Sequence, residues 1–108
     1  MSSPIVLFDG MTYTVSLFRP DATGTMKEEK HSFGEHSLSV GAYDRAGKRA
    51  WSWQIKGGPP ADDGFFYYLY AQPYDVGAAN FIWLQNKEEA IALHKAIKDA
   101  EELNDYRN

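Results

Sequence analysis

The chain of 108 residues is long enough for one domain, and its 44% hydrophobic and 24% charged residues are close to globular averages. Its formal net charge of −4 excludes a strongly basic protein that binds nucleic acid by neutralising phosphates. The lack of cysteine excludes disulfides, thiolate zinc sites and cysteine nucleophiles. We therefore expect one globular domain over residues 1–108, with no cofactor, no metal and no nucleic-acid partner.

The first eight residues, MSSPIVLF, contain an apolar run of four residues and no basic segment before it. A secretory signal peptide needs both features, and a membrane span needs about 20 apolar residues. We therefore expect a cytoplasmic protein that does not bind membranes.

The first predicted element is a β-hairpin. Asp9-Gly10 lies between two apolar runs, which is typical of a two-residue turn that needs positive φ angles. This turn would join strands at about 4–8 and 11–18. In the second strand, Tyr13, Val15 and Leu17 alternate with hydroxyl side chains, which predicts one face on the core.

The next segment is polar. After a turn-rich stretch at 19–24, residues 25–33 include Lys27, Glu28, Glu29 and Lys30. Long structureless loops are uncommon in compact domains, so we expect an edge strand whose charges block pairing with other chains. A short helical turn at 25–33 fits the same charges and stays an alternative.

Two more strands follow in the middle of the chain. Alternation over 38–43 and 50–55, with turn residues at 44–47, predicts a hairpin with Trp51 and Trp53 on one face. Residues 57–64, GGPPADDG, have the composition of a loop.

Residues 65–70, FFYYLY, form the most β-prone run in the chain and are aromatic or apolar on both faces. Pro73 ends this strand, a loop follows at 74–77, and Phe81–Leu84 is the last strand. If strand 65–70 lay at the edge of a sheet, it would invite a homodimer through that edge.

The last element is a helix that begins after Asn86. Asn86 is a good N-cap, and Glu89 follows three residues later as in a capping box. At 100° per residue one arc of the helix is apolar. The members of this arc are Ala90, Leu93, Ala96, Ile97, Ala100 and Leu103. Residues 104–108 are expected to form a flexible tail.

Together these elements predict an α+β domain: a strongly bent antiparallel β-sheet of six or seven strands closed by one C-terminal amphipathic helix. The order resembles the pleckstrin-homology-like superfold, most closely over residues 81–97, FIWLQNKEEAIALHKAI. Leu93 stands where those domains place a helical Trp. Their phosphoinositide sites use basic residues around the first loop, whereas Asp9-Gly10 has no basic neighbour before Arg19. Lipid binding is therefore not expected.

No catalytic or metal-binding motif is present in the sequence. His31, His36 and His94 lack the ligand number and spacing of a zinc site. The adjacent acidic pairs are expected to face water, because general acid–base catalysis needs two carboxylates directed into one cleft. Gly57-Gly58-Pro59-Pro60 lacks the Gly-Lys-Ser/Thr of a phosphate loop, and a nucleophile elbow is also missing.

Aromatic residues make up 15% of the chain, which is more than one closed interior is expected to hide. Strand 65–70 carries rings on both faces, so one face needs another cover or meets a partner. We therefore predict a non-catalytic protein-interaction module that binds a protein or peptide through an exposed aromatic sheet surface. The predicted binding residues are Phe66, Tyr68, Tyr70, Tyr74, Asp62 and Asp63.

Two other functions fit the sequence. A small acidic protein can act as an inhibitor or immunity-type protein that masks a basic enzyme, with Asp62, Asp63, Glu101 and Glu102 steering association. Alternatively, a pocket between helix and sheet can hold a small ligand or support an enzymatic reaction, although the sequence favours binding over catalysis.

Overall fold

The computed structural model describes residues 3–10, 12–44, 61–75, 77 and 79–107 of the chain. This part contains six antiparallel strands and one helix. In chain order they are β1 (Ile5–Asp9), β2 (Thr12–Pro20), β3 (Met26–Gly34), β4 (His36–Asp44), β5 (Phe65–Pro73), β6 (Asn80–Leu84) and α2 (Lys87–Arg107). The predicted α+β class with a C-terminal helix is confirmed.

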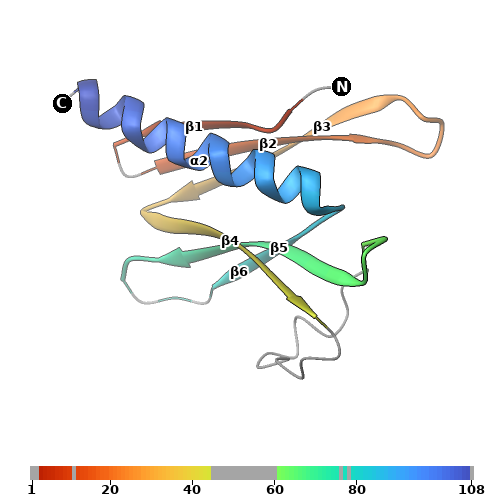
Figure 1. Ribbon diagram of the computed structural model, residues 1–108. Helices are drawn as coiled ribbons and strands as arrows, with labels where there is room; N and C mark the ends of the chain where they lie inside the picture. Colours follow the sequence, from red (N-terminus) through yellow and green to blue (C-terminus); the bar gives the residue numbers. More distant parts are fainter. Residues whose placement is uncertain (1–2, 11, 45–60, 76, 78, 108) are drawn as a thin grey trace.

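The strands form two sheets rather than the single bent sheet that we predicted. Their orders are β1-β2-β3 and β4-β5-β6. Figure 1 shows one sheet above the other, with α2 running diagonally across one side of both. The chain passes from β3 to β4 at Glu35, which has a φ of 48°, and these two strands do not pair. Alternation in the sequence shows which side chains of a strand share a face, but it does not show which strands pair. The division of the six strands into two sheets could therefore not be predicted from alternation.

The first sheet contains the predicted N-terminal hairpin. Asp9 pairs with Thr12, so the turn begins at Gly10, one residue later than predicted. Gly10 has a φ of 70°, a conformation that glycine adopts without steric cost. The polar segment forms β3 at the edge of this sheet. It pairs with β2 along its whole length, with Thr12 opposite Gly34 at one end and Pro20 opposite Met26 at the other. The edge-strand prediction is confirmed, and the helical alternative is wrong.

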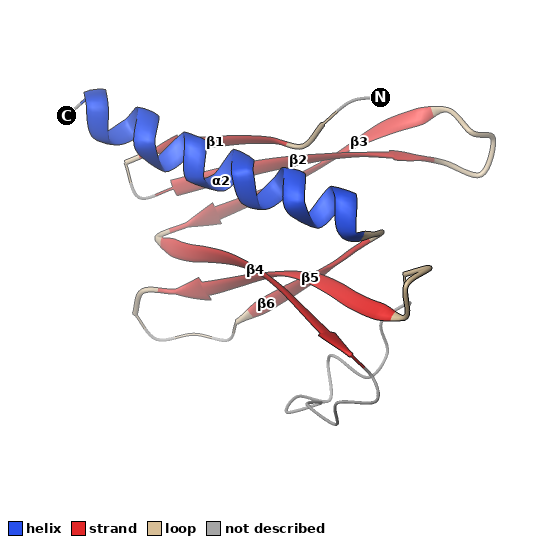
Figure 2. Ribbon diagram, in the orientation of Figure 1, coloured by secondary structure: helices blue, strands red, loops and turns tan. Residues whose placement is uncertain are grey.

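In the second sheet β5 lies between β4 and β6. A central strand offers no free edge, so this route to a homodimer is removed. The predicted partner of residues 38–43, at 50–55, lies outside the described residues. The same holds for Trp51, Trp53 and the Gly57–Pro60 loop. Figure 2 shows both sheets and the helix by type of secondary structure.

The core lies between the two sheets and α2. Its centre consists of side chains with almost no exposure, namely Tyr13, Val15, Leu17, Leu69, Leu84 and Leu93. The helix contacts β1 of the first sheet and β4, β5 and β6 of the second. It therefore stabilises both sheets through one apolar face.

The predicted apolar arc of the helix is confirmed at Ala90, Leu93, Ile97 and Ala100, which are buried. Leu103 is 59% exposed, so its assignment to the arc is wrong. The helix also continues through Arg107 instead of ending near residue 103. Figure 1 shows the C-terminal end of this helix extending past the strands. The described helix is not long and apolar enough to cross a membrane.

Candidate functional site

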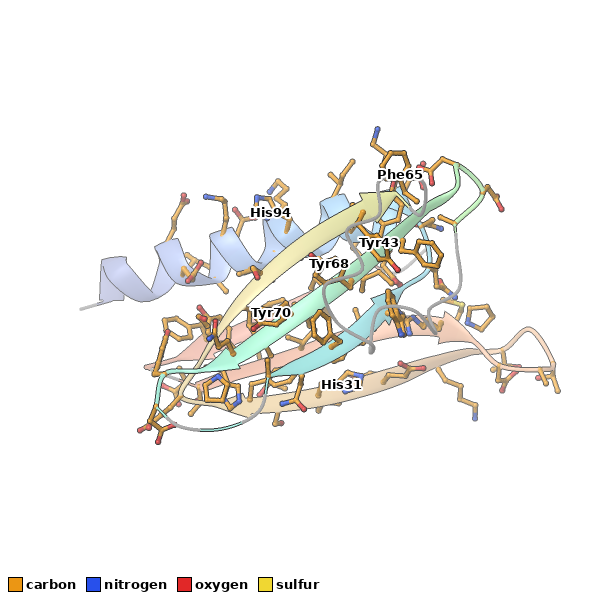
Figure 3. All side chains as sticks on the ribbon, turned by 90° about the horizontal axis from the view of Figure 1, so that it is seen from below. His31, Tyr43, Phe65, Tyr68, Tyr70 and His94 are labelled. Atoms are coloured by element: carbon orange, nitrogen blue, oxygen red, sulfur yellow. The ribbon has the colours of Figure 1, made fainter. Side chains whose placement is uncertain are left out.

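The outer face of the second sheet carries a row of aromatic side chains. Alternate residues of a strand point to opposite faces, so Tyr67 and Leu69 enter the core while Tyr68 and Tyr70 point away from it. The rings on this outer face are Tyr43 from β4, Phe66, Tyr68 and Tyr70 from β5, and Phe81 and Trp83 from β6. Figure 3 views the molecule from the side of this sheet.

Phe66 does not belong to an exposed site, although we predicted it there. It is 1% exposed, and its ring stacks on Tyr43 at 4.9 Å and meets the edge of Trp83 at 6.2 Å. Tyr68 and Tyr70, in contrast, are half-buried. Both pack against Phe81, with ring centroids at 5.5 and 4.9 Å.

Tyr68 lies directly over Gly41 of β4. A Cβ atom at Gly41 would come within 2.5 Å of the Tyr68 hydroxyl oxygen, so this ring position requires a residue with no side chain. Partial burial, together with the neighbouring Tyr70, raises the pKa of Tyr68 above its ordinary value. A cavity of about 300 Å³ opens here, lined by Ser39, Val40, Gly41, Tyr68 and Tyr70. We call it the Tyr68–Tyr70 cavity.

The other predicted binding residues lie away from this cavity. Asp62 and Asp63 precede β5, and Tyr74 follows its last residue. Nine strand residues separate them, a span of roughly 30 Å at about 3.3 Å per residue. Asp63 accepts hydrogen bonds from the Phe65 amide (3.0 Å) and the Tyr67 hydroxyl (2.5 Å), so it has a structural role. The six predicted residues do not form one site.

The acidic residues of the inhibitor alternative are also divided between two roles. Glu101 accepts a hydrogen bond of 2.7 Å from the buried Tyr13 hydroxyl, which ties α2 to β2. Asp62 and Glu102 remain exposed. All four carboxylates are exposed, but only Asp63 and Glu101 also accept these internal hydrogen bonds.

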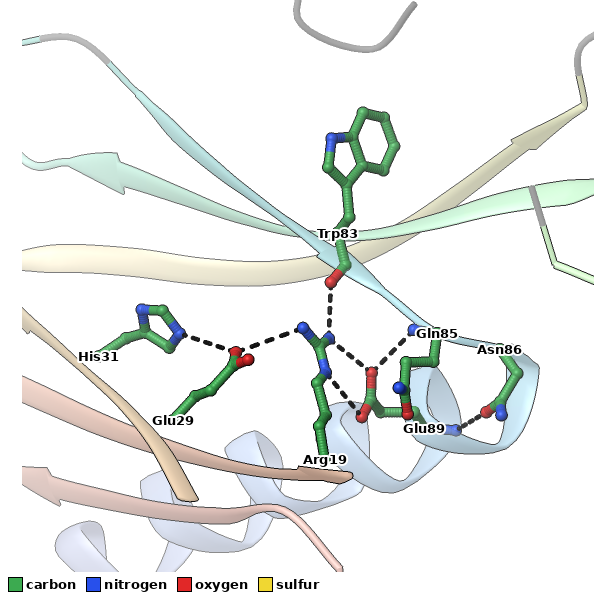
Figure 4. Close-up of polar contacts among 7 residues, drawn as sticks. All are labelled: Arg19, Glu29, His31, Trp83, Gln85, Asn86 and Glu89. Carbon is green, nitrogen blue, oxygen red and sulfur yellow. Dashed lines mark hydrogen bonds and ion pairs between the residues drawn. The ribbon is translucent and has the colours of Figure 1, made fainter. Parts of the chain in front are cut away.

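A polar cluster around Arg19 was not predicted (Figure 4). The Arg19 guanidinium donates to Glu89 at 2.8 Å, to the Trp83 carbonyl at 2.6 Å and to Glu29 at 3.4 Å. Glu29 also lies 3.8 Å from Nε2 of His31. Arg19 thus joins β2 and β3 of one sheet to β6 of the other and to the helix.

The guanidinium of Arg19 is occupied by these acceptors, and its side chain is only 17% exposed. We therefore assign it a structural role. Alternation over Tyr13, Val15 and Leu17 already places Arg19 on the inner face of β2. That signal predicts a buried cation, but it does not reveal the acceptors.

The histidines do not gather in the structure. His31 is on β3, His36 hydrogen-bonds the Gly34 carbonyl through Nδ1, and His94 is exposed on α2. In the described ranges, no group of three or more His, Asp or Glu side chains is placed to hold a metal ion.

An open depression lies between helix and sheet, where the small-ligand alternative places its pocket. It measures about 350 Å³ and lies between β4 and α2. Its lining is mostly apolar, with Lys87 and His94 as the only basic side chains among the residues Val40, Gly41, Ala42, Tyr67, Lys87, Ala90, Ile91 and His94.

Comparison of the chain with protein-family models, with curated proteins and with solved structures gives no match. The functional argument therefore depends on the geometry described above.

Proposed function

We propose that this protein is a non-catalytic binding module that holds a segment of another protein against Tyr68 and Tyr70. The observation that carries the proposal is the Tyr68–Tyr70 cavity, where two half-buried tyrosine rings border the backbone of β4. Tyrosine is enriched at the energetic centres of protein interfaces because its ring is large and its hydroxyl can hydrogen-bond.

The position of Gly41 supports this proposal. Glycine within a strand weakens it, since it adds no packing and costs conformational entropy. Here the missing side chain gives the Tyr68 ring its place beside β4. The strand thus contains a destabilising glycine at the position that makes room for the Tyr68 ring in the cavity.

A pleckstrin-homology-like architecture remains part of the same proposal. Six antiparallel strands followed by a C-terminal helix are consistent with that element order. The division of these strands into two three-stranded sheets differs from the single bent sheet that we predicted.

The test compares partner capture by three variants and the wild-type protein. Tyr68→Ala/Tyr70→Ala removes both rings, whereas Gly41→Ala keeps the rings and displaces Tyr68. Phe65→Ala is the matched control, because it removes a ring that is 40% exposed outside the cavity. Partners captured from an extract of the producing cells are identified by mass spectrometry, after circular dichroism shows that each variant is folded.

We expect one or more partners to be lost with both cavity variants and retained with Phe65→Ala. Removing a hot-spot tyrosine costs upward of about 2 kcal/mol of binding free energy, or roughly a thirtyfold loss of affinity. Identical partner sets for the wild-type protein and both cavity variants would refute the proposed function.

A further inference from the structure

A groove that shares no lining residue with the Tyr68–Tyr70 cavity lies beside the first turns of α2. Its volume is about 400 Å³, and it is bordered by α2, by the far ends of β2 and β3, and by the segment before β1. Figure 1 shows the β2–β3 loop projecting beyond the first turn of the helix at this corner. Its lining includes Phe18, Pro20, Met26, Asn86, Glu88 and Ala92.

The walls of this groove are apolar. Phe18 and Pro20 come from the outer face of β2, Met26 from the start of β3 and Ala92 from the helix. Met26 is 47% exposed, so part of this surface is in contact with water. An apolar side chain that entered the groove would remove this surface from water, which favours binding.

The apolar surface continues from the groove onto β1. Ile5 pairs with Ser16, two residues from Phe18 on the same face, and Leu7 follows along the same side of β1. Ile5 is 50% and Leu7 65% exposed. An exposed apolar strip next to a groove is typical of a protein-binding surface.

The charged residues that line the groove, Glu88 and Glu89, are acidic. Glu89 is compensated by Arg19, but Glu88 has no ion pair within the described part of the chain. Glu28 lies directly across from Phe18 in the β2–β3 register and is likewise unpaired there. The lining contains no basic residue, and Lys30 lies further along β3, beside Ser16. Two uncompensated carboxylates therefore flank an apolar floor.

We propose that this groove, with the Ile5–Leu7 strip, binds an apolar segment of a partner protein that carries a Lys or Arg side chain. The stem of such a side chain packs on Phe18 and Met26, and its charged end meets Glu88 and Glu28. The net charge of −4 attracts a basic partner over longer distances. This surface is separate from the Tyr68–Tyr70 cavity, so either proposal can fail alone.

The test uses the full chain and the synthetic peptide acetyl-Leu-Arg-Leu-Arg-Leu-amide, followed by amide chemical shifts in NMR titrations. The glutamate twin, acetyl-Leu-Glu-Leu-Glu-Leu-amide, is the probe control. Glu88→Lys is compared with Glu102→Lys, which changes the net charge equally at an exposed site on the same helix. Leu7→Ser is compared with Leu103→Ser, which removes a leucine of similar exposure at the end of α2.

We expect saturable shifts at Gln85, Asn86 and Ala92 with the arginine peptide and none with its twin. Glu88→Lys should raise the dissociation constant about two- to fivefold, the range of a partly exposed ion pair, while Glu102→Lys should change it little. Leu7→Ser should also weaken binding more than Leu103→Ser.

Three outcomes would overturn this inference. The first is the absence of saturable shifts, and the second is an equal effect of the two lysine variants, which would indicate general charge attraction only. The third is a concentration-dependent shift of the same amides without peptide, which would make a second copy of the chain the occupant.

Discussion

At the scale of single residues, the contact between Tyr67 and Asp63 has consequences that a titration can measure. Hydrogen bonds from the Tyr67 hydroxyl and then the Phe65 amide hold the pKa of Asp63 below its ordinary 3.8. The same bond to Asp63, followed by burial and the carboxylate charge, raises the pKa of Tyr67 to about 12. Each group thus keeps the protonation state that the hydrogen bond needs.

The signs of the two stability effects are opposite. The lowered pKa of Asp63 contributes stability above the unfolded value of 3.8, and this contribution is lost as the pH falls through the folded pKa. The raised pKa of Tyr67 contributes stability that is complete below its unfolded value of 10.0 and is lost as the pH rises toward 12. The turn before β5 should therefore loosen at both extremes of pH.

Tyr67→Phe should raise the pKa of Asp63 toward its ordinary value, because the largest cause of the lowered pKa is removed. The pKa is measured by carboxyl ¹³C NMR titration of the wild-type protein and the variant. Tyr74→Phe is the control, because Tyr74 follows the far end of β5, away from this carboxylate. An unchanged pKa of Asp63 in Tyr67→Phe would show that the hydrogen bond does not form in solution.

The candidate site was predictable only in part at this scale. Alternation in the sequence places Tyr68 and Tyr70 on one face, and the structure agrees. The same rule selects Phe66, which is 1% exposed and contacts rings from β4 and β6, and a single sequence does not reveal that register. The Arg19 cluster was missed for a related reason. Its acceptors are 10, 64 and 70 residues away in the chain.

At the scale of elements, the start of α2 combines a predicted cap with a tertiary contact. Asn86 Oδ1 accepts a hydrogen bond of 2.8 Å from the Glu89 amide, as the sequence indicated. The Glu89 carboxylate accepts from the Gln85 amide at 2.9 Å, one residue before the cap. It also receives the Arg19 guanidinium, so the same side chain satisfies the helix end and the cluster.

Asn86→Ala should lower the free energy of unfolding by about 1 kcal/mol, because the Glu89 amide loses its acceptor at the helix end. Asn86→Asp keeps an acceptor and should stay within a few tenths of a kcal/mol of the wild-type protein. Urea unfolding followed by circular dichroism measures both values. If the two variants lost equal stability, the cap would not be what stabilises this end of the helix.

Elements with strong local patterns were predicted well, and the assembly of those elements was not. The central run of β5 and the helix start follow from β propensity and capping chemistry, whereas the edge strand β3 was inferred from its charges and from the rarity of long structureless loops. The side chain near the end of the helix was misassigned, since Leu103 fits the periodicity of the apolar arc but is 59% exposed. Pairing into two sheets depends on contacts between distant residues, for which one sequence holds no local signal.

At the scale of the whole molecule, the fold depends on how two small sheets and one helix are held together. A three-stranded sheet with one buried face is stable only when that face is covered. The helix covers part of both sheets through Leu93 and its neighbours, and the Tyr13–Glu101 hydrogen bond ties its far end to β2. Arg19 makes the polar connection between both sheets and the helix.

Arg19→Met should destabilise the protein by roughly 2–4 kcal/mol, since Glu89 is 10% exposed and would lose its partner. Adding Glu89→Gln should recover part of this loss, because the uncompensated charge is then absent. Urea unfolding of the wild-type protein, both single variants and the double variant gives the coupling free energy.

A double-mutant cycle on Lys95 and Asp99 is the control for this coupling free energy. That pair is 2.7 Å apart, but both side chains are exposed and lie on one helix. Solvent screens such pairs, so the coupling between Lys95 and Asp99 should be much smaller than between Arg19 and Glu89. Equal coupling in the two cycles would mean that the Arg19 cluster contributes no more than a surface ion pair. The joining of the two sheets would then depend on the apolar contacts of α2 alone.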